Sequence, residues 1–178
     1  MSVVSDMIRK VFKEGDDKRD AGLTTPEGIR RFDDIVYGND DACQVLDVYR
    51  PKEAEGDLPV IVSVHGGGWV YGDKERYQYY CMDLAMRGFA VVNFTYRLAP
   101  EHKYPASIED TNLVFSWVLE HGKEYGFDTE HVYGVGDSAG AHNLSLYTAI
   151  CTNPEYAAKY PFQPPKGFVP TAVALNCG

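Results

Sequence analysis

Ser138 stands in the run GDSAG at 136–140, directly after the apolar stretch HVYGVG at 131–136. A helical pattern, SAGAHNLSLYTAICT, continues from it to residue 152. The pattern G-x-S-x-G between a buried strand and a helix is typical of a sharp turn that exposes a nucleophilic serine. The positive end of the following helix would favour a negatively charged oxygen there. The same residues also fit an ordinary strand–helix connection with a serine N-cap, so this motif alone leaves both interpretations open.

A second motif, HGGGW at 65–69, follows the apolar run VIVSV. Three successive glycines cost conformational entropy, and a turn alone seldom requires all three. They expose backbone N–H groups without side chains, as an oxyanion hole requires. A phosphate-binding loop is a poor alternative, because the sequence lacks the pattern G-x-x-x-x-G-K-[ST]. The order of the two motifs, glycine loop and then serine turn, therefore favours acyl-transfer chemistry.

Three sequence blocks together resemble the hormone-sensitive-lipase-like branch of the α/β-hydrolase esterases and lipases. They are HGGGW at 65–69, YRLAPEHKYPA at 96–106 and GDSAGA at 136–141. The resemblance covers roughly residues 32–178 and implies a serine hydrolase that uses no metal or organic cofactor. It also implies that the amino-terminal helix is a cap over the acyl pocket.

The resemblance implies a role for six residues. Ser138 would be the catalytic nucleophile. The backbone N–H groups of the oxyanion hole would come from Gly67, Gly68 and Ala139, and the loop would be shaped by His65 and Gly66. In the middle block, Arg97 and Glu101 are expected to hold loops near the site.

Serine hydrolases of this family use a catalytic triad of serine, acid and histidine. The acid and the histidine are not found where the family carries them. Related enzymes present serine, acid and histidine in that chain order, whereas the only candidates after Ser138 are His142 and then Glu155. His142 is one helical turn beyond Ser138, which favours a place on the helix surface. We therefore expect that the catalytic acid and histidine are not present in this chain and that the chain is a fragment. Because serine is a poor nucleophile without a base, we expect it to be inactive or very weak alone.

The first twenty residues carry apolar side chains at helical spacing: Val4, Met7, Ile8, Val11 and Phe12. This spacing predicts an amphipathic helix. We expect it to end near Gly15, with the charged run at 16–20 disordered. Residues 1–20 are accordingly assigned to a helical cap segment, and residues 21–178 to a hydrolase core that is incomplete at its carboxy terminus.

The core alternates strand and helix patterns. A hairpin is expected from 31–38 and 43–51, joined by the turn formers at 38–41. Buried strands are expected at 60–66, 89–97, 131–136 and 171–178, and helices at 75–88, 107–126 and 138–152. The proline-rich segment 153–170 is expected to be a loop or a short broken helix. This alternation predicts an α/β fold with a mostly parallel sheet and helices on both faces, which by the resemblance is the amino-terminal part of an α/β-hydrolase fold.

Composition narrows the class of protein. The 178 residues carry a net charge of -9, which argues against nucleic-acid binding. No run is apolar enough for a signal peptide or a membrane span, so a cytoplasmic location is expected. The cysteines (Cys43, Cys81, Cys151 and Cys177) lack the spacing of a zinc site or a disulfide framework. A homodimer is compatible with the sequence.

The leading hypothesis is a serine carboxylesterase that hydrolyses short-acyl esters, with a small-molecule ester as its partner. One alternative is an arylformamidase-like amidase, since the continuation at 141–143 resembles formamidases and acetyl-xylan esterases. Another is a non-catalytic binding or interaction protein on the same fold. The aromatic residues after the glycine loop could line an acyl or sugar pocket or could pack the following helix: Trp69, Tyr71, Tyr77, Tyr79 and Tyr80.

Overall fold

The computed structural model describes residues 2–40 and 42–178. Its centre is one six-stranded sheet with the order β1-β2-β4-β3-β5-β6. The strands are β1 (Ile29–Val36), β2 (Val45–Pro51), β3 (Leu58–Val64), β4 (Ala90–Phe94), β5 (Phe127–Asp137) and β6 (Ala172–Asn176). β1 and β2 form the expected antiparallel hairpin, and β4, β3, β5 and β6 are parallel to one another. Asp41, at the end of the expected hairpin turn, lies outside the described residues, as does Met1.

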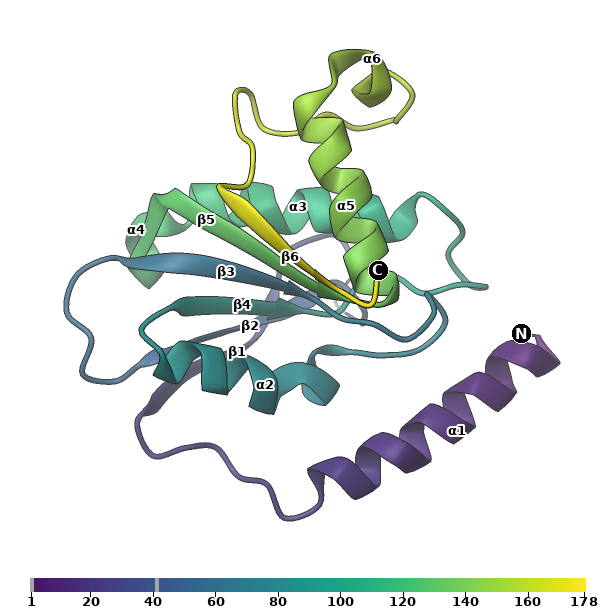
Figure 1. Ribbon diagram of the computed structural model, residues 1–178, viewed down its shortest axis with the longest axis horizontal. Coiled ribbons are helices and arrows are strands. Elements are labelled where there is room, and N and C mark those ends of the chain that lie inside the picture. Colours follow the sequence, from purple (N-terminus) through teal and green to yellow (C-terminus); the bar gives the residue numbers. More distant parts are fainter. Residues whose placement is uncertain (1, 41) are drawn as a thin grey trace.

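Helices cover both faces of the sheet, as expected (Figure 1). The helices are α1 (Val3–Asp20), α2 (Lys74–Met86), α3 (Ala106–Glu120), α4 (Gly122–Tyr125), α5 (Ala139–Thr152) and α6 (Pro154–Ala157). α3 and α5 lie on one face and α2 on the other, while α1 extends along the α2 side (Figure 1). The α/β-hydrolase architecture with a mostly parallel sheet is therefore confirmed.

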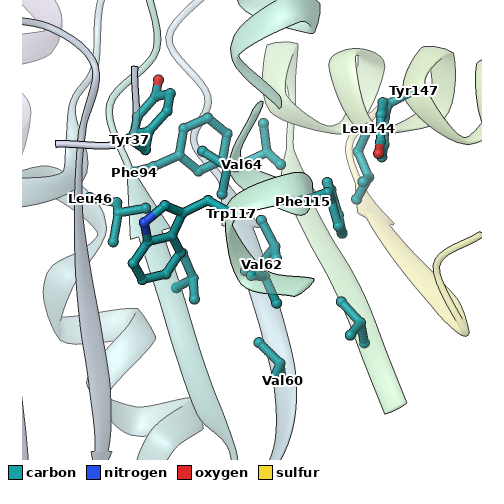
Figure 2. Packing of buried hydrophobic residues seen from close by; sticks show 14 of the residues in the cluster. Tyr37, Leu46, Val60, Val62, Val64, Phe94, Phe115, Trp117, Leu144 and Tyr147 are labelled. Atoms are coloured by element: carbon teal, nitrogen blue, oxygen red, sulfur yellow. The ribbon is translucent and has the colours of Figure 1, made fainter. Parts of the chain in front are cut away.

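The apolar strands are buried because alternate side chains serve two cores. Val60, Val62 and Val64 of β3 pack with the side chains of α3 and α5 (Figure 2). Ile61, between them, packs on the opposite face with Met82 of α2. Such burial on both faces explains why the strand is a continuous apolar run. Because β3, β4 and β5 are parallel, the loops that follow them lie at the same edge of the sheet.

Helix α1 differs from the expectation that it ends near Gly15, because it continues to Asp20. A glycine inside a helix costs only about 1 kcal/mol, which neighbouring contacts can offset. Here the charged run is ordered by ion pairs between Lys13 and Asp17 at 2.6 Å and between Arg19 and Asp16 at 2.8 Å.

Strand β6 forms as expected, but its expected burial on both faces is wrong. Only Val173 is half-buried, and its neighbours in the strand are exposed. β6 pairs with β5 on one side and packs near α5, and it lies at the edge of the described sheet.

Candidate active site

Ser138 occupies a strained turn between β5 and α5. Its backbone has φ 50° and ψ −115°, a conformation that costs a non-glycine residue on the order of 1–3 kcal/mol. The flanking glycines make the turn possible: a Cβ on Gly136 would lie 2.6 Å from the carbonyl oxygen of Gly140, and one on Gly140 would overlap the carbonyl of Val64. The Ser138 N–H donates to the carbonyl of Asn176 in β6 at 2.8 Å. The side chain is exposed, as a nucleophile must be.

The glycine loop after β3 folds back on itself. The carbonyl of Gly67 accepts hydrogen bonds from the N–H groups of Val70 at 3.2 Å and Tyr71 at 3.0 Å. Gly67 (φ 117°) and Gly68 (φ 61°) both adopt left-handed backbone that other residues rarely tolerate. Within residues 2–40 and 42–178, the N–H groups of Gly67, Gly68 and Ala139 donate no hydrogen bond, so they are free to bind an oxyanion.

One cavity of about 480 Å³ joins the serine turn to the glycine loop. Its lining includes Ser138, Asp137, Gly66, Gly67 and Gly68 on one side. Helix α1 supplies the other side through Val11, Phe12, Gly15, Asp16 and Arg19. The structure thus brings four of the six expected site residues together, while Ala139 follows Ser138 as the buried first residue of α5 and His65 lies outside the lining.

His65 is fully buried beneath the loop. Its ring stacks on Tyr96 at 3.9 Å, and its Nδ1 donates to the carbonyl of Gly66 at 2.7 Å. Burial lowers the pKa of His65 to about 4, so the ring is neutral at physiological pH. These contacts suit a residue that shapes the loop, and they leave His65 remote from proton transfer at Ser138.

The YRLAPE block ties helix α1 to the glycine loop. Arg9 donates to the carbonyls of Val70 at 2.7 Å and Ala99 at 3.0 Å, and it pairs with Glu101 at 2.7 Å. The hydrogen bonds from Arg9 lower the pKa of Glu101 to about 2. Arg97 pairs with Asp110 and Glu109, at 2.7 and 2.6 Å. Arg97 therefore ties the segment after β4 to α3, and Glu101 ties the same segment to α1.

The cavity around Ser138 is lined by none of the histidines in the described chain. His142 is exposed on α5 and packs edge-on against Trp69, with ring centroids 5.3 Å apart. His142 and His102 line a separate cavity of about 280 Å³ behind Trp69. Glu155 is exposed in α6. The absence of the catalytic acid and histidine from this chain stays a prediction.

Sequence patterns missed one contact at the site. The hydroxyl of Tyr77 in α2 donates to the Asp137 carboxylate at 2.8 Å and accepts the Gly66 N–H at 3.1 Å. Tyr77 also lines the cavity. In the sequence, Tyr77 is only one of several aromatic residues after the glycine loop, and no spacing rule relates position 77 to positions 66 and 137.

Among the described residues, one group of side chains places its ligand atoms close enough to hold a metal ion. It consists of Asp40, Cys43 and His102, whose ligand atoms lie within 4.8 Å of one another. Two of the three residues share a tight turn, in which the Gln44 N–H donates to the Asp40 carbonyl at 2.7 Å. Burial and the Asp40 carboxylate raise the pKa of the Cys43 thiol to about 12. The group lies outside the Ser138 cavity.

Comparisons with known proteins identify the family to which the chain belongs. Residues 46–165 match the family BD-FAE. Carboxylesterase NlhH of Mycobacterium tuberculosis is 38% identical over 121 residues, which are 67% of this chain and 38% of that protein. Esterase LipC of the same species is 33% identical over 129 residues, which are 71% of this chain and 32% of that protein.

The structural comparison extends the likeness over nearly the whole chain. Esterase B from Lactobacillus rhamnosis superimposes with a TM-score of 0.87 at 31% identity, covering 94% of this chain and 55% of that one. The chain thus spans about a third of these curated relatives and just over half of the solved one. None of the helices in the described residues has the length and apolar character needed to cross a bilayer. The chain belongs to the BD-FAE family and, with it, to the hormone-sensitive-lipase-like α/β-hydrolase esterases.

Proposed function

We propose that this chain carries the nucleophile and oxyanion hole of a serine carboxylesterase that acts on short-acyl esters. The observation that carries the proposal is the cavity shared by Ser138 and a glycine loop in which the N–H groups of Gly67 and Gly68 lack acceptors in the described residues. A strained serine at the start of a helix, facing free N–H donors, suits attack on a carbonyl group.

The reaction follows from these roles. The Ser138 Oγ attacks the ester carbonyl carbon while a base takes the hydroxyl proton. The resulting oxyanion accepts hydrogen bonds from the N–H groups of Gly67, Gly68 and Ala139. The C–O bond to the alcohol then breaks, and the alcohol leaves with the proton. Water attacks the acyl-enzyme by the same route and releases the carboxylic acid. The base and its acid partner would come from outside this chain.

The cavity favours a small, uncharged acyl group. Val11 and Phe12 of α1 bound it opposite the glycine loop. Its charged side chains are Asp16, Asp137 and Arg19, a balance that disfavours anionic esters. One solved relative, Esterase B, is described as inhibited by a C4-C4 tributyrin phosphonate, which supports a short-acyl ester for this chain as well.

The test is acylation of Ser138 in the 178-residue chain by p-nitrophenyl acetate, with imidazole added as an external base. Mass spectrometry of the peptide containing Ser138 should show one acetyl group, which Ser138→Ala abolishes. Ser145→Ala, on the same helix, is the matched control and should leave the adduct unchanged. Without imidazole, turnover should be slow, because the described histidines lie outside the cavity.

The outcomes separate the alternatives. No Ser138 adduct at any imidazole concentration would favour the non-catalytic binding protein. The observation that favours this alternative is that the described histidines lie outside the cavity. Faster turnover of a formanilide than of the acetate ester would favour the amidase. Rapid turnover without imidazole that Ser138→Ala abolishes would show that the base lies within this chain. A cytoplasmic location and self-association stay predictions from the sequence.

A further inference from the structure

Tyr77 connects the two backbone segments on which the proposed chemistry depends. It lies in the first half of α2, and its side chain reaches the edge of the sheet where β3 and β5 end. There its hydroxyl donates to Asp137 Oδ2 at 2.8 Å and accepts from the Gly66 N–H at 3.1 Å. Asp137 directly precedes the nucleophile, and Gly66 directly precedes the two expected oxyanion donors. A single oxygen atom thus bridges the serine turn and the glycine loop.

We propose that Tyr77 is a positioning residue that sets the spacing between the oxyanion donors and Ser138. This inference rests on the proposed function, since the spacing matters only where an oxyanion forms. Oxyanion stabilisation depends on donors that are held in place before the reaction, and small displacements of catalytic groups cost large factors in rate.

The fit around Gly66 supports this role. A Cβ on Gly66 would lie 2.9 Å from the Tyr77 hydroxyl oxygen and 2.9 Å from both the carbonyl and carboxylate oxygens of Asp137. The first glycine of the motif therefore leaves room for the bridge, whereas Gly67 and Gly68 provide left-handed backbone. The three glycines therefore have different roles. The Gly66 N–H donates to Tyr77, and the N–H groups of Gly67 and Gly68 stay free to bind substrate.

The electrostatic surroundings keep the bridge intact. Burial and the hydrogen bond to Asp137 raise the pKa of Tyr77, so its hydroxyl keeps its proton at neutral and mildly alkaline pH. A hydroxyl that donates to a carboxylate forms a stronger hydrogen bond than one between neutral groups. The Tyr77 hydroxyl should therefore keep its role as donor at neutral and mildly alkaline pH.

The test compares Tyr77→Phe with Tyr79→Phe in the 178-residue chain. Tyr79 lies on the same helix, but its hydroxyl donates to the Leu23 carbonyl, outside both loops. The rate of Ser138 acetylation is measured against p-nitrophenyl acetate concentration at fixed imidazole. We expect Tyr77→Phe to lower the maximal rate by about tenfold with half-saturation unchanged. Tyr79→Phe should leave both values unchanged. Asp137→Asn, which keeps an oxygen acceptor for the hydroxyl, should retain most of the rate.

A second measurement separates failure of this inference from failure of the proposed function. Hydrogen exchange of the Gly66 amide, followed by NMR, reports the bridge without any reaction. It should accelerate in Tyr77→Phe and stay unchanged in Tyr79→Phe. Unchanged Gly66 exchange, or accelerated exchange with an unchanged maximal rate, would overturn the positioning role. No Ser138-dependent acetylation in the parent chain would instead overturn the proposed function and, with it, the inference that depends on it.

Discussion

The serine turn and helix α1 form opposite walls of the same cavity, but different contacts hold them in place. At the serine turn, backbone lies directly against backbone, since Gly140 approaches the carbonyls of Val64 and His65 with no room for a side chain. Helix α1 has one buried residue, Ser5, and is tied to the glycine loop and to Glu101 through Arg9. Packed backbone fixes geometry closely, whereas exposed charge pairs contribute little free energy. The cavity therefore has one rigid wall and one wall that salt can weaken.

Gly140→Ala should have the largest effect on stability. Its Cβ would overlap the Val64 carbonyl, so strands or helix must shift. Overpacking at such a site costs about 3 kcal/mol or more, which urea unfolding followed by circular dichroism can measure. A decrease in the free energy of unfolding well under about 1 kcal/mol would contradict the close packing of Gly140 against Val64.

Acid should weaken the rigid wall through His65. Its pKa is about 4 in the folded protein and 6.5 in the unfolded chain, so the unfolded state binds the proton first as pH falls. Stability is thus fully present above pH 6.5 and declines by about 3 kcal/mol toward pH 4. Urea unfolding across this range should show the decline in the parent and in His131→Gln, whose ring is exposed. His65→Asn should flatten it, and a parent curve that is already flat would contradict the assignment.

Glu101→Gln should loosen the other wall. It removes the partner of Arg9, and a pair this exposed contributes little to the free energy of unfolding. Amide hydrogen exchange should accelerate in α1 of the variant, while the strands stay protected. In the parent chain, about 1 M salt should likewise accelerate exchange in α1, because it screens the ion pair. Glu120→Gln, at an exposed end of α3, is the control and should change neither region. Equal acceleration in α1 and in the sheet would remove the distinction between the walls.

Gly15→Ala should have the smallest effect, and of opposite sign to that of Gly140→Ala. Nothing lies within 4 Å of a Cβ at position 15, so alanine gains helix propensity without a clash. Helix α1 should become more stable by about 0.5–1 kcal/mol, seen as slower amide exchange there. Faster exchange would mean that α1 needs the glycine for its place over the cavity.

The sequence predicts most of the rigid wall because local patterns encode it. Apolar runs such as 60–66 specify strands, and the glycine spacing around Ser138 specifies the turn. The observed end of α1 differs from the predicted one because Arg19 and Asp17 both contact Arg76 of α2. These contacts outweigh the low helix propensity of Gly15. The exposure of β6 depends on its place in the strand order, which its own composition does not contain. The Tyr77 bridge requires the docking of α2 against two distant loops, so no local pattern could predict it.

The hydrogen bond from Ser138 to Asn176 has a consequence for how the serine turn loses its geometry. The backbone of the strained serine is restrained on one side by this bond and on the other by the His142 N–H, which donates to its carbonyl at 3.0 Å. In the 178-residue chain, β6 lies at the edge of the described sheet, and a strand at a sheet edge opens at lower free energy than the core. Fraying of β6 removes one restraint and lets Ser138 relax to ordinary dihedral angles. In the 178-residue chain, imidazole-assisted acetylation of Ser138 is therefore expected to be lost at a lower urea concentration than the helical circular-dichroism signal.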